Sequence, residues 1–234
     1  WIIAMQSRGG GWGAFDADNT HYHLNHIPFA DHGALLDPPT ADVTARCVSF
    51  LAQLGRAEDR AVIERGLAFL RQDQEADGSW FGRWGTNYIY GTWSVLCALN
   101  AAGVSPDDPC VRRAVAWLVA VQRDDGGWGE DEASYGDAPP GQYKESTPSQ
   151  TAWALLGLMA AGEAEHPAVA RGLEYLVATQ GDDGEWRELP YTAVGFPRVF
   201  YLRYHGYRLF FPLLAMARFR NLRRGNSRKV AFGF

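Results

Sequence analysis

Cysteine is scarce in this chain of 234 residues. The three cysteines, Cys47, Cys97 and Cys110, show no C-x-x-C spacing, and their number is odd. Such a pattern does not indicate a disulfide framework, and it is typical of a protein from a reducing compartment.

Other familiar signals are missing as well. The sequence contains no P-loop, no G-x-G-x-x-G and no G-x-S-x-G motif, so it offers none of the local signatures of nucleotide binding or of a nucleophilic serine. The net charge of −5 argues against nucleic acid as the main partner. No segment has the ~20 predominantly apolar residues that a membrane-spanning helix needs.

A metal site is not expected either. His21, His23 and His26 crowd one segment, but no cysteine or further histidine pair completes a ligand set. The stretch from Asp16 to Thr20 resembles the start of a calcium loop, yet it lacks the later glycine and glutamate of such loops. We expect a polar turn there.

What the chain does have is a repeated pairing of glutamine and tryptophan. A glutamine is followed six residues later by a tryptophan in four places: Gln6–Trp12, Gln74–Trp80, Gln122–Trp128 and Gln180–Trp186. An Arg-Gly or Arg-Ala pair precedes the last three copies, at Arg65-Gly66, Arg113-Ala114 and Arg171-Gly172. Recurrence at intervals of roughly 50 to 70 residues indicates a repeat architecture. Because the first copy begins without its pair, we expect the chain to be the C-terminal piece of a longer protein.

Two kinds of helix alternate around these motifs. Amphipathic helices with charged faces are predicted at Asp59–Gln72, Val111–Gln122 and Ala168–Gln180, and helices without any charge at Tyr88–Ala102 and Ser149–Ala161. The alternation predicts two concentric layers, with the uncharged helices inside. Glycines in the Gln–Trp turns would supply positive φ angles, and the glutamine amide and indole N–H would bond backbone groups at helix ends. We therefore expect these motifs to be structural.

Aromatic side chains gather in two further segments, residues 79–90 and 195–207. Such clusters are usually core, but rings that line a cavity can stabilise a carbocation. Basic residues gather in residues 218–234, where we favour a solvated tail over a surface for acidic lipid headgroups.

Several of these segments together resemble the C-terminal third of bacterial squalene–hopene cyclases, which are class II triterpene cyclases. The resemblance is carried by MQSRGGGWGAFDADNT, HIPFADHGALLDPPTADVTAR, DGSWFGRWGTNYIYGTW, DGGWGEDEASYGDA, STPSQTAWALLGL and GFPRVFYLRYHGYRLFFPLLAMARF. It implies an all-α fold, an incomplete α/α toroid built from Gln–Trp repeats over residues 1–234. It also implies acid-initiated cyclisation of squalene to pentacyclic hopene or hopanol, without metal or organic cofactor.

The resemblance further assigns roles to residues. Asp42, Arg46 and Tyr90 match positions that polarise and orient the catalytic acid. The residues expected to contact substrate are Phe15, Phe29, Trp84, Phe196, Phe200, Leu202, Tyr204 and Tyr207, with Phe29 at the substrate entrance. Some relatives carry histidine where Arg46 stands. A permanent cation there could orient an acid but could not shuttle its proton.

The acid itself is absent from this sequence. The family's Asp-x-Asp-Asp-Thr-Ala motif does not occur, and Asp16-x-Asp18-Asn19-Thr20 belongs to a different segment. We therefore expect the 234-residue chain alone to be inactive and poorly soluble. Two alternatives stay open: a related cyclase acting on another polyprenyl chain, and a helical-repeat module without catalytic activity.

The resemblance also bears on partners and location. It implies squalene or a similar linear triterpene as substrate, no nucleic acid, and peripheral, monotopic attachment at the cytoplasmic face of a bacterial membrane. A homodimer of the full-length protein is compatible with it.

Overall fold

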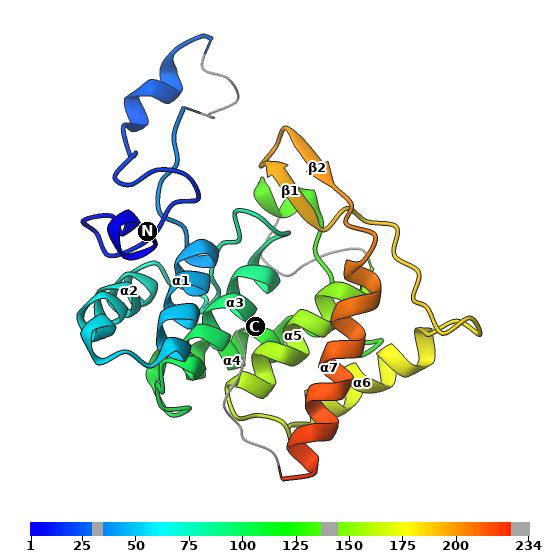
Figure 1. Ribbon diagram of the computed structural model, residues 1–234. Helices are drawn as coiled ribbons and strands as arrows, with labels where there is room; N and C mark the ends of the chain where they lie inside the picture. Colours follow the sequence, from blue (N-terminus) through cyan, green and yellow to red (C-terminus); the bar gives the residue numbers. More distant parts are fainter. Residues whose placement is uncertain (30–34, 137–144, 226–234) are drawn as a thin grey trace.

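A computed structural model describes residues 1–29, 35–136 and 145–225 of the chain. The part described is mostly helical, with one small β-hairpin (Figure 1). The helices are α1 (Ala41–Leu54), α2 (Arg60–Gln72), α3 (Tyr88–Ala101), α4 (Pro109–Ala120), α5 (Pro148–Ala160), α6 (Pro167–Thr179) and α7 (Tyr207–Arg223). The strands are β1 (Ala193–Phe196) and β2 (Phe200–Leu202). Short 3₁₀ helices occur at Ile3–Met5, Tyr22–His26, Ala57–Asp59 and Glu132–Tyr135.

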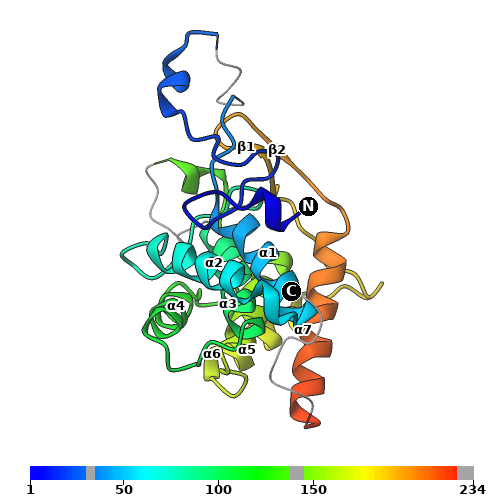
Figure 2. The same cartoon turned by 60° about the vertical axis from the view of Figure 1, so that its left-hand side comes forward.

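The helices form two layers. α1, α3, α5 and α7 lie side by side in that order, each in contact with the next (Figure 1). α2 packs on α1, α4 on α3 and α5, and α6 on α5, so these three form the outer layer (Figure 2). The predicted all-α, two-layer arrangement is confirmed, and the inner helices form an open arc rather than a closed ring.

Burial explains which helices lie inside. Every residue of α5 is buried, as are most residues of α3, in agreement with the two uncharged helices that the sequence predicts. The charge pattern did not indicate α1, which belongs to the inner layer although it carries Asp42 and Arg46. These two side chains line a cavity at one end of the arc, so a charge in an inner helix here marks a site.

The Gln–Trp motifs are structural, as predicted. Each indole N–H donates to the carbonyl oxygen ten residues before it, at 2.7 Å in Trp80, Trp128 and Trp186 and at 2.8 Å in Trp12. The glutamine amide closes its own turn by donating to a glycine carbonyl, for example from Gln122 to Gly126 at 2.8 Å.

The same glutamines join one repeat to the next. Gln122 donates to Ala168 of α6, and Arg171 of α6 donates back to the Gln122 amide oxygen. Equivalent bonds link Gln6 and Gln74 to α2 and α4. The arginine that precedes each of the last three motifs therefore bonds the glutamine of the preceding motif, a role that the sequence pattern did not reveal.

Two elements differ from the sequence prediction. The aromatic segment after residue 192 contains a hairpin, β1 paired antiparallel with β2, where the all-helical pattern predicted no strand. Helix α7 continues to Arg223, so the predicted basic tail from residue 218 starts too early, and its residues 226–234 lie outside the described residues.

Candidate active-site cavity

Asp42 is the buried carboxylate of the site. It lies in the first turn of α1 and is 1% exposed. Its Oδ1 accepts hydrogen bonds from the Thr40 hydroxyl at 2.6 Å and the Val43 N–H at 3.0 Å, and its Oδ2 accepts from the Trp84 N–H at 2.8 Å. Burial raises the pKa of Asp42, and the hydrogen bonds from Thr40, Trp84 and Val43 oppose that rise.

Arg46 and Tyr90 face the same space from two neighbouring helices. Arg46 lies one turn after Asp42 on α1, and its Nη2 is 3.5 Å from the Ser94 hydroxyl of α3. Tyr90 lies in the first turn of α3. Burial raises its pKa to about 12, against the lowering effect of the nearby Arg46 charge. The Tyr90 phenol is therefore protonated at neutral pH and can donate a hydrogen bond.

These three side chains line one cavity of about 400 Å³. Its remaining walls are apolar or aromatic and come from Ala14, Phe15, Val43 and Trp84. The structure thus brings together five residues that the sequence had assigned to two roles, polarising the acid and contacting substrate. The roles assigned to these five residues stay predictions.

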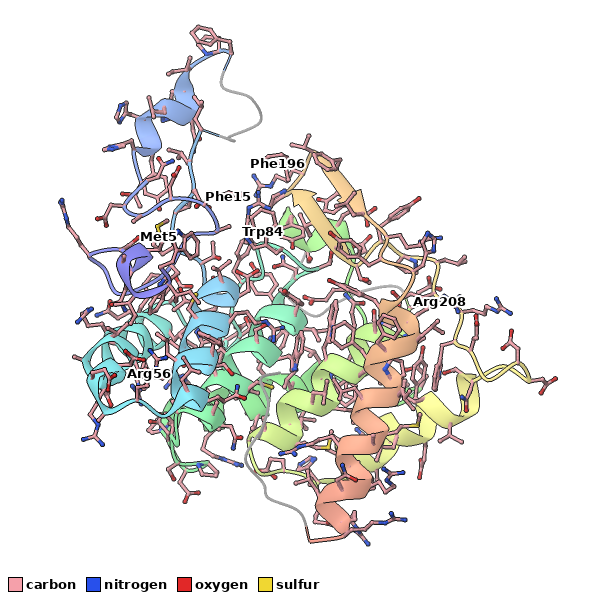
Figure 3. All side chains as sticks on the ribbon, in the orientation of Figure 1. Met5, Phe15, Arg56, Trp84, Phe196 and Arg208 are labelled. Carbon is pink, nitrogen blue, oxygen red and sulfur yellow. The ribbon has the colours of Figure 1, made fainter. Side chains whose placement is uncertain are left out.

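An aromatic path leads from this cavity toward the hairpin. Phe15 meets Trp84 edge to face, with ring centroids 5.8 Å apart. The guanidinium of Arg83 lies 4.4 Å from the Trp84 ring and 5.3 Å from the Phe196 ring. A smaller cavity of about 230 Å³ is lined by Phe15, Trp84 and Phe196 among others. Figure 3 shows these three residues together, between the projecting N-terminal segment and β1.

The hairpin positions Phe196 and Phe200. Their rings are 5.6 Å apart and edge to face. Phe200 packs over Gly195, where an added Cβ would overlap the phenyl ring, so a larger residue there would displace the ring from its present position. Leu202 lies on the same strand as Phe200, and both are partly open to solvent, at 38% and 45% exposure.

Tyr204 and Tyr207 connect the hairpin to the inner helices. Their rings are 5.0 Å apart. Tyr207 also packs edge-on against Trp153 of α5 at 5.8 Å, and Tyr90 reaches the same indole at 5.1 Å. A chain of ring contacts therefore runs from Tyr204, just after β2, through Tyr207 and Trp153 to Tyr90. Phe200, Leu202, Tyr204 and Tyr207 line none of the cavities described here.

Phe29 stays apart from the other predicted residues. It is 87% exposed and lines none of these cavities. Part of the sequence segment that suggested its role, residues 30–34, lies outside the described residues.

Sequence reasoning missed several residues around the site. Arg83 covers two of the predicted rings, and Trp93 lies beneath Arg46. A signal for Trp93 was present, because Trp93 and Ser94 follow Tyr90 by three and four residues, the spacing that places side chains on one helix face. Nothing comparable in the sequence indicated Trp153, which comes from a different helix.

The described residues contain no group of three or more histidine, cysteine or acidic side chains arranged to hold a metal ion. His21 and His23 meet as rings 6.0 Å apart. No helix in the described ranges is long and apolar enough to cross a bilayer.

The layered arc, the Gln–Trp connectors and the aromatic cavity around a buried carboxylate together define a wall of an α/α toroid of the terpene cyclase kind. The family model for the squalene-hopene cyclase C-terminal domain matches residues 1–221. The chain belongs to the squalene–hopene cyclase family.

Known proteins agree with this assignment. The chain is 65% identical to a squalene–hopene cyclase of Bradyrhizobium diazoefficiens over all of its own length, and 66% identical to a probable squalene–hopene cyclase of Sinorhizobium fredii over 97% of it. It spans only 36% and 35% of those relatives. A solved type II terpene cyclase from Scytonema, MstE, has the same fold with a TM-score of 0.62 at 20% identity, covering 93% of this chain and 64% of that chain.

Proposed function

We propose that a protein containing this chain converts squalene into a pentacyclic hopene or hopanol by acid-initiated cyclisation. One observation carries the proposal: Asp42, Arg46 and Tyr90 share a cavity with Phe15 and Trp84. The polar groups bind and orient an acid that lies outside this chain, and the rings stabilise positive charge as it moves along the folding polyene. Family membership and the names of the two relatives support squalene as the substrate.

The polar groups have distinct parts in this proposal. Asp42 is buried and its pKa is raised, so it can hold or share a proton with a neighbouring acid at a pH where an ordinary aspartate could not. Tyr90 donates a hydrogen bond, and Arg46 supplies a permanent positive charge that favours the conjugate base left after protonation of the alkene. The apolar walls exclude water, which would otherwise quench a cation early.

The test is a chimera in which residues 1–234 replace the matching third of the Bradyrhizobium diazoefficiens relative. The chimera is incubated with squalene in detergent micelles, and products are identified by gas chromatography and mass spectrometry. Pentacyclic products are expected from the chimera and none from the 234-residue chain or the truncated relative alone. A folded chimera that leaves squalene unchanged would refute the proposal. If the chimera instead clearly prefers a shorter polyprenyl chain, that chain takes the place of squalene as the proposed substrate.

We also propose peripheral attachment to the cytoplasmic face of a bacterial membrane, because squalene dissolves in lipid rather than in water. Exposed apolar side chains such as Phe210 and Leu213 on α7, at 69% and 62% exposure, together with Arg220 and Arg223 near its end, support this idea. Flotation of the chimera with anionic vesicles should recover it in the lipid fraction. Recovery in the soluble fraction at low salt would count against attachment.

A further inference from the structure

The guanidinium of Arg46 rests on an aromatic ring. Its Cζ lies 4.4 Å from the centroid of the Trp93 ring on α3, and its Nη2 is near the Ser94 hydroxyl. Within the described ranges, no carboxylate lies within 4.0 Å ion-pair distance of Arg46. The oxygens of Asp42, one turn away, are engaged by Thr40 and by backbone N–H groups instead. The charge of Arg46 is therefore held in place without being neutralised.

Trp93 is itself fixed by rings from two other inner helices. It stacks on Trp153 of α5 with centroids 5.7 Å apart and planes 5° from parallel, and both indoles are fully buried. Phe211 of α7 meets each of them edge-on at 5.4 Å. A ring clamped by α5 and α7 can be displaced only with its neighbours, because interiors are close-packed.

Tyr90 depends on the same pair of indoles. Its ring lies edge-on to Trp93 at 5.6 Å and to Trp153 at 5.1 Å, and the nearby Arg46 charge lowers the pKa of its hydroxyl against the effect of burial. Two of the three polar groups of the cavity thus rest on one aromatic platform, formed by Trp93 and Trp153, which does not itself line the cavity.

We propose that Trp93 is a positioning residue that holds the Arg46 guanidinium at the cavity wall between Asp42 and Tyr90. The inference deepens the proposed function and rests on it. A carboxylate in the place of Trp93 would also hold Arg46, but it would cancel the charge that the conjugate base of the acid needs. An aromatic face attracts the cation and leaves its charge available.

The test is a double-mutant cycle in the chimera with Trp93→Leu, Arg46→Met and the pair. Trp93→Leu should lower kcat about tenfold and leave KM within about twofold, because Trp93 touches Arg46 and not the substrate. In the Arg46→Met background the same substitution should lower kcat no further. Trp93→Phe, which keeps an aromatic face, should restore most of the lost kcat.

Trp117→Leu is the matched control. Trp117 is buried on α4 in the outer layer, away from the platform, so its loss should lower the melting temperature without changing kcat of the folded enzyme. An equal loss of kcat from Trp93→Leu in both Arg46 backgrounds, or a loss no larger than that of Trp117→Leu, would overturn the proposal. If Trp93→Leu does not fold, the cycle is run with Trp93→Phe, whose smaller loss must likewise vanish in the Arg46→Met background.

A second readout separates this proposal from the proposed function. The same cycle is measured by thermal unfolding of the chimera, which requires no turnover. The fall in melting temperature of the double variant should be smaller than the two single effects added together. Additive effects would overturn the contact. An unsubstituted chimera that makes no product while still showing coupling would refute only the proposed function.

Discussion

At the scale of single residues, Asp42 combines deep burial with a full set of hydrogen bonds. A carboxylate in that position is costly to desolvate, and three donors reduce the cost without removing it. As a result the pKa of Asp42 is raised. The nearby Tyr90 also has a raised pKa, of about 12. The two groups are thus suited to sharing protons and hydrogen bonds with an acid, and less suited to binding an apolar chain.

The first residue-scale prediction concerns turnover. In the chimera, Asp42→Asn and Tyr90→Phe should each lower kcat far more than they raise KM, because both side chains act on the acid rather than on squalene. Steady-state kinetics on squalene micelles check this. A change confined to KM in either variant would contradict the assigned role.

The second concerns the pH dependence of stability. Because burial raises the pKa of Asp42 in the folded state above its ordinary value of 3.8, the contribution of this group to stability is complete below that value. It is lost as the pH rises through the folded-state pKa. The difference in unfolding free energy between the unsubstituted protein and its Asp42→Asn variant should therefore fall from pH 3 to neutral pH. Denaturant titrations of both proteins over that range measure it, and a constant difference would contradict the burial argument.

At the scale of elements, each of the first three Gln–Trp turns is shaped by the outer helix that follows it. Gly126 has a φ of 87°, and a Cβ there would lie 2.7 Å from the Arg171 carbonyl oxygen of α6. Gly103 has a similar φ of 77° with nothing within 4 Å. Alanine would cause similar backbone strain at both positions. At Gly126 the added methyl group would also meet α6, whereas at Gly103 it would meet no neighbour.

This contrast gives a matched pair of variants. Gly126→Ala should be less stable than Gly103→Ala by about 1–3 kcal/mol, the usual cost of forcing an extra methyl group into a packed site. Denaturant unfolding of the two variants measures the difference. Equal stabilities would mean that α6 does not constrain the turn.

The elements also show what the sequence could and could not predict. α3 and α5 were predictable because full burial removes charge from a whole helix. α1 was not predictable as an inner helix. Its charged residues Asp42 and Arg46 face a cavity, but in the sequence they look the same as charged residues that face solvent. The hairpin was missed because the helical pattern was extended across residues 193–202, although Val194, Phe196, Phe200 and Tyr201 are of types that strands favour.

The site followed a similar division. Asp42, Arg46, Tyr90, Phe15 and Trp84 were named from resemblance before the structure placed them around one cavity. Trp153 could not be found in this way, since its relation to Trp93 exists only once α3 and α5 pack together.

At the scale of the whole molecule, the open arc leaves apolar surface at its ends. Phe210 and Leu213 of α7 are 69% and 62% exposed, and Phe50 and Leu54 of α1 are 48% and 44% exposed. Apolar surface of this kind favours association. The 234-residue chain should therefore form oligomers or aggregates in detergent-free buffer at tens of micromolar, as sedimentation velocity would show. A stable monomer would mean that the arc shields its own core.

The central claim is a division of labour between two sets of aromatic residues. Trp128 is fully buried and donates to Leu118, so it stabilises the repeat. Phe200 packs on Phe196, whose ring lies 5.3 Å from the Arg83 guanidinium, and the role proposed for it is to stabilise cations. Phe200→Ala should leave cations exposed and yield partly cyclised products, whereas Trp128→Ala should lose about 3–5 kcal/mol of stability and keep its products.

The most direct measurement is the product spectrum of the two variants in the chimera, determined at a temperature at which both are folded. The account predicts a mixture of incompletely cyclised hydrocarbons from Phe200→Ala and an unchanged pentacyclic product from Trp128→Ala. The same single pentacyclic product from both variants would contradict it, because the Phe200 ring would then have no part in stabilising the cations.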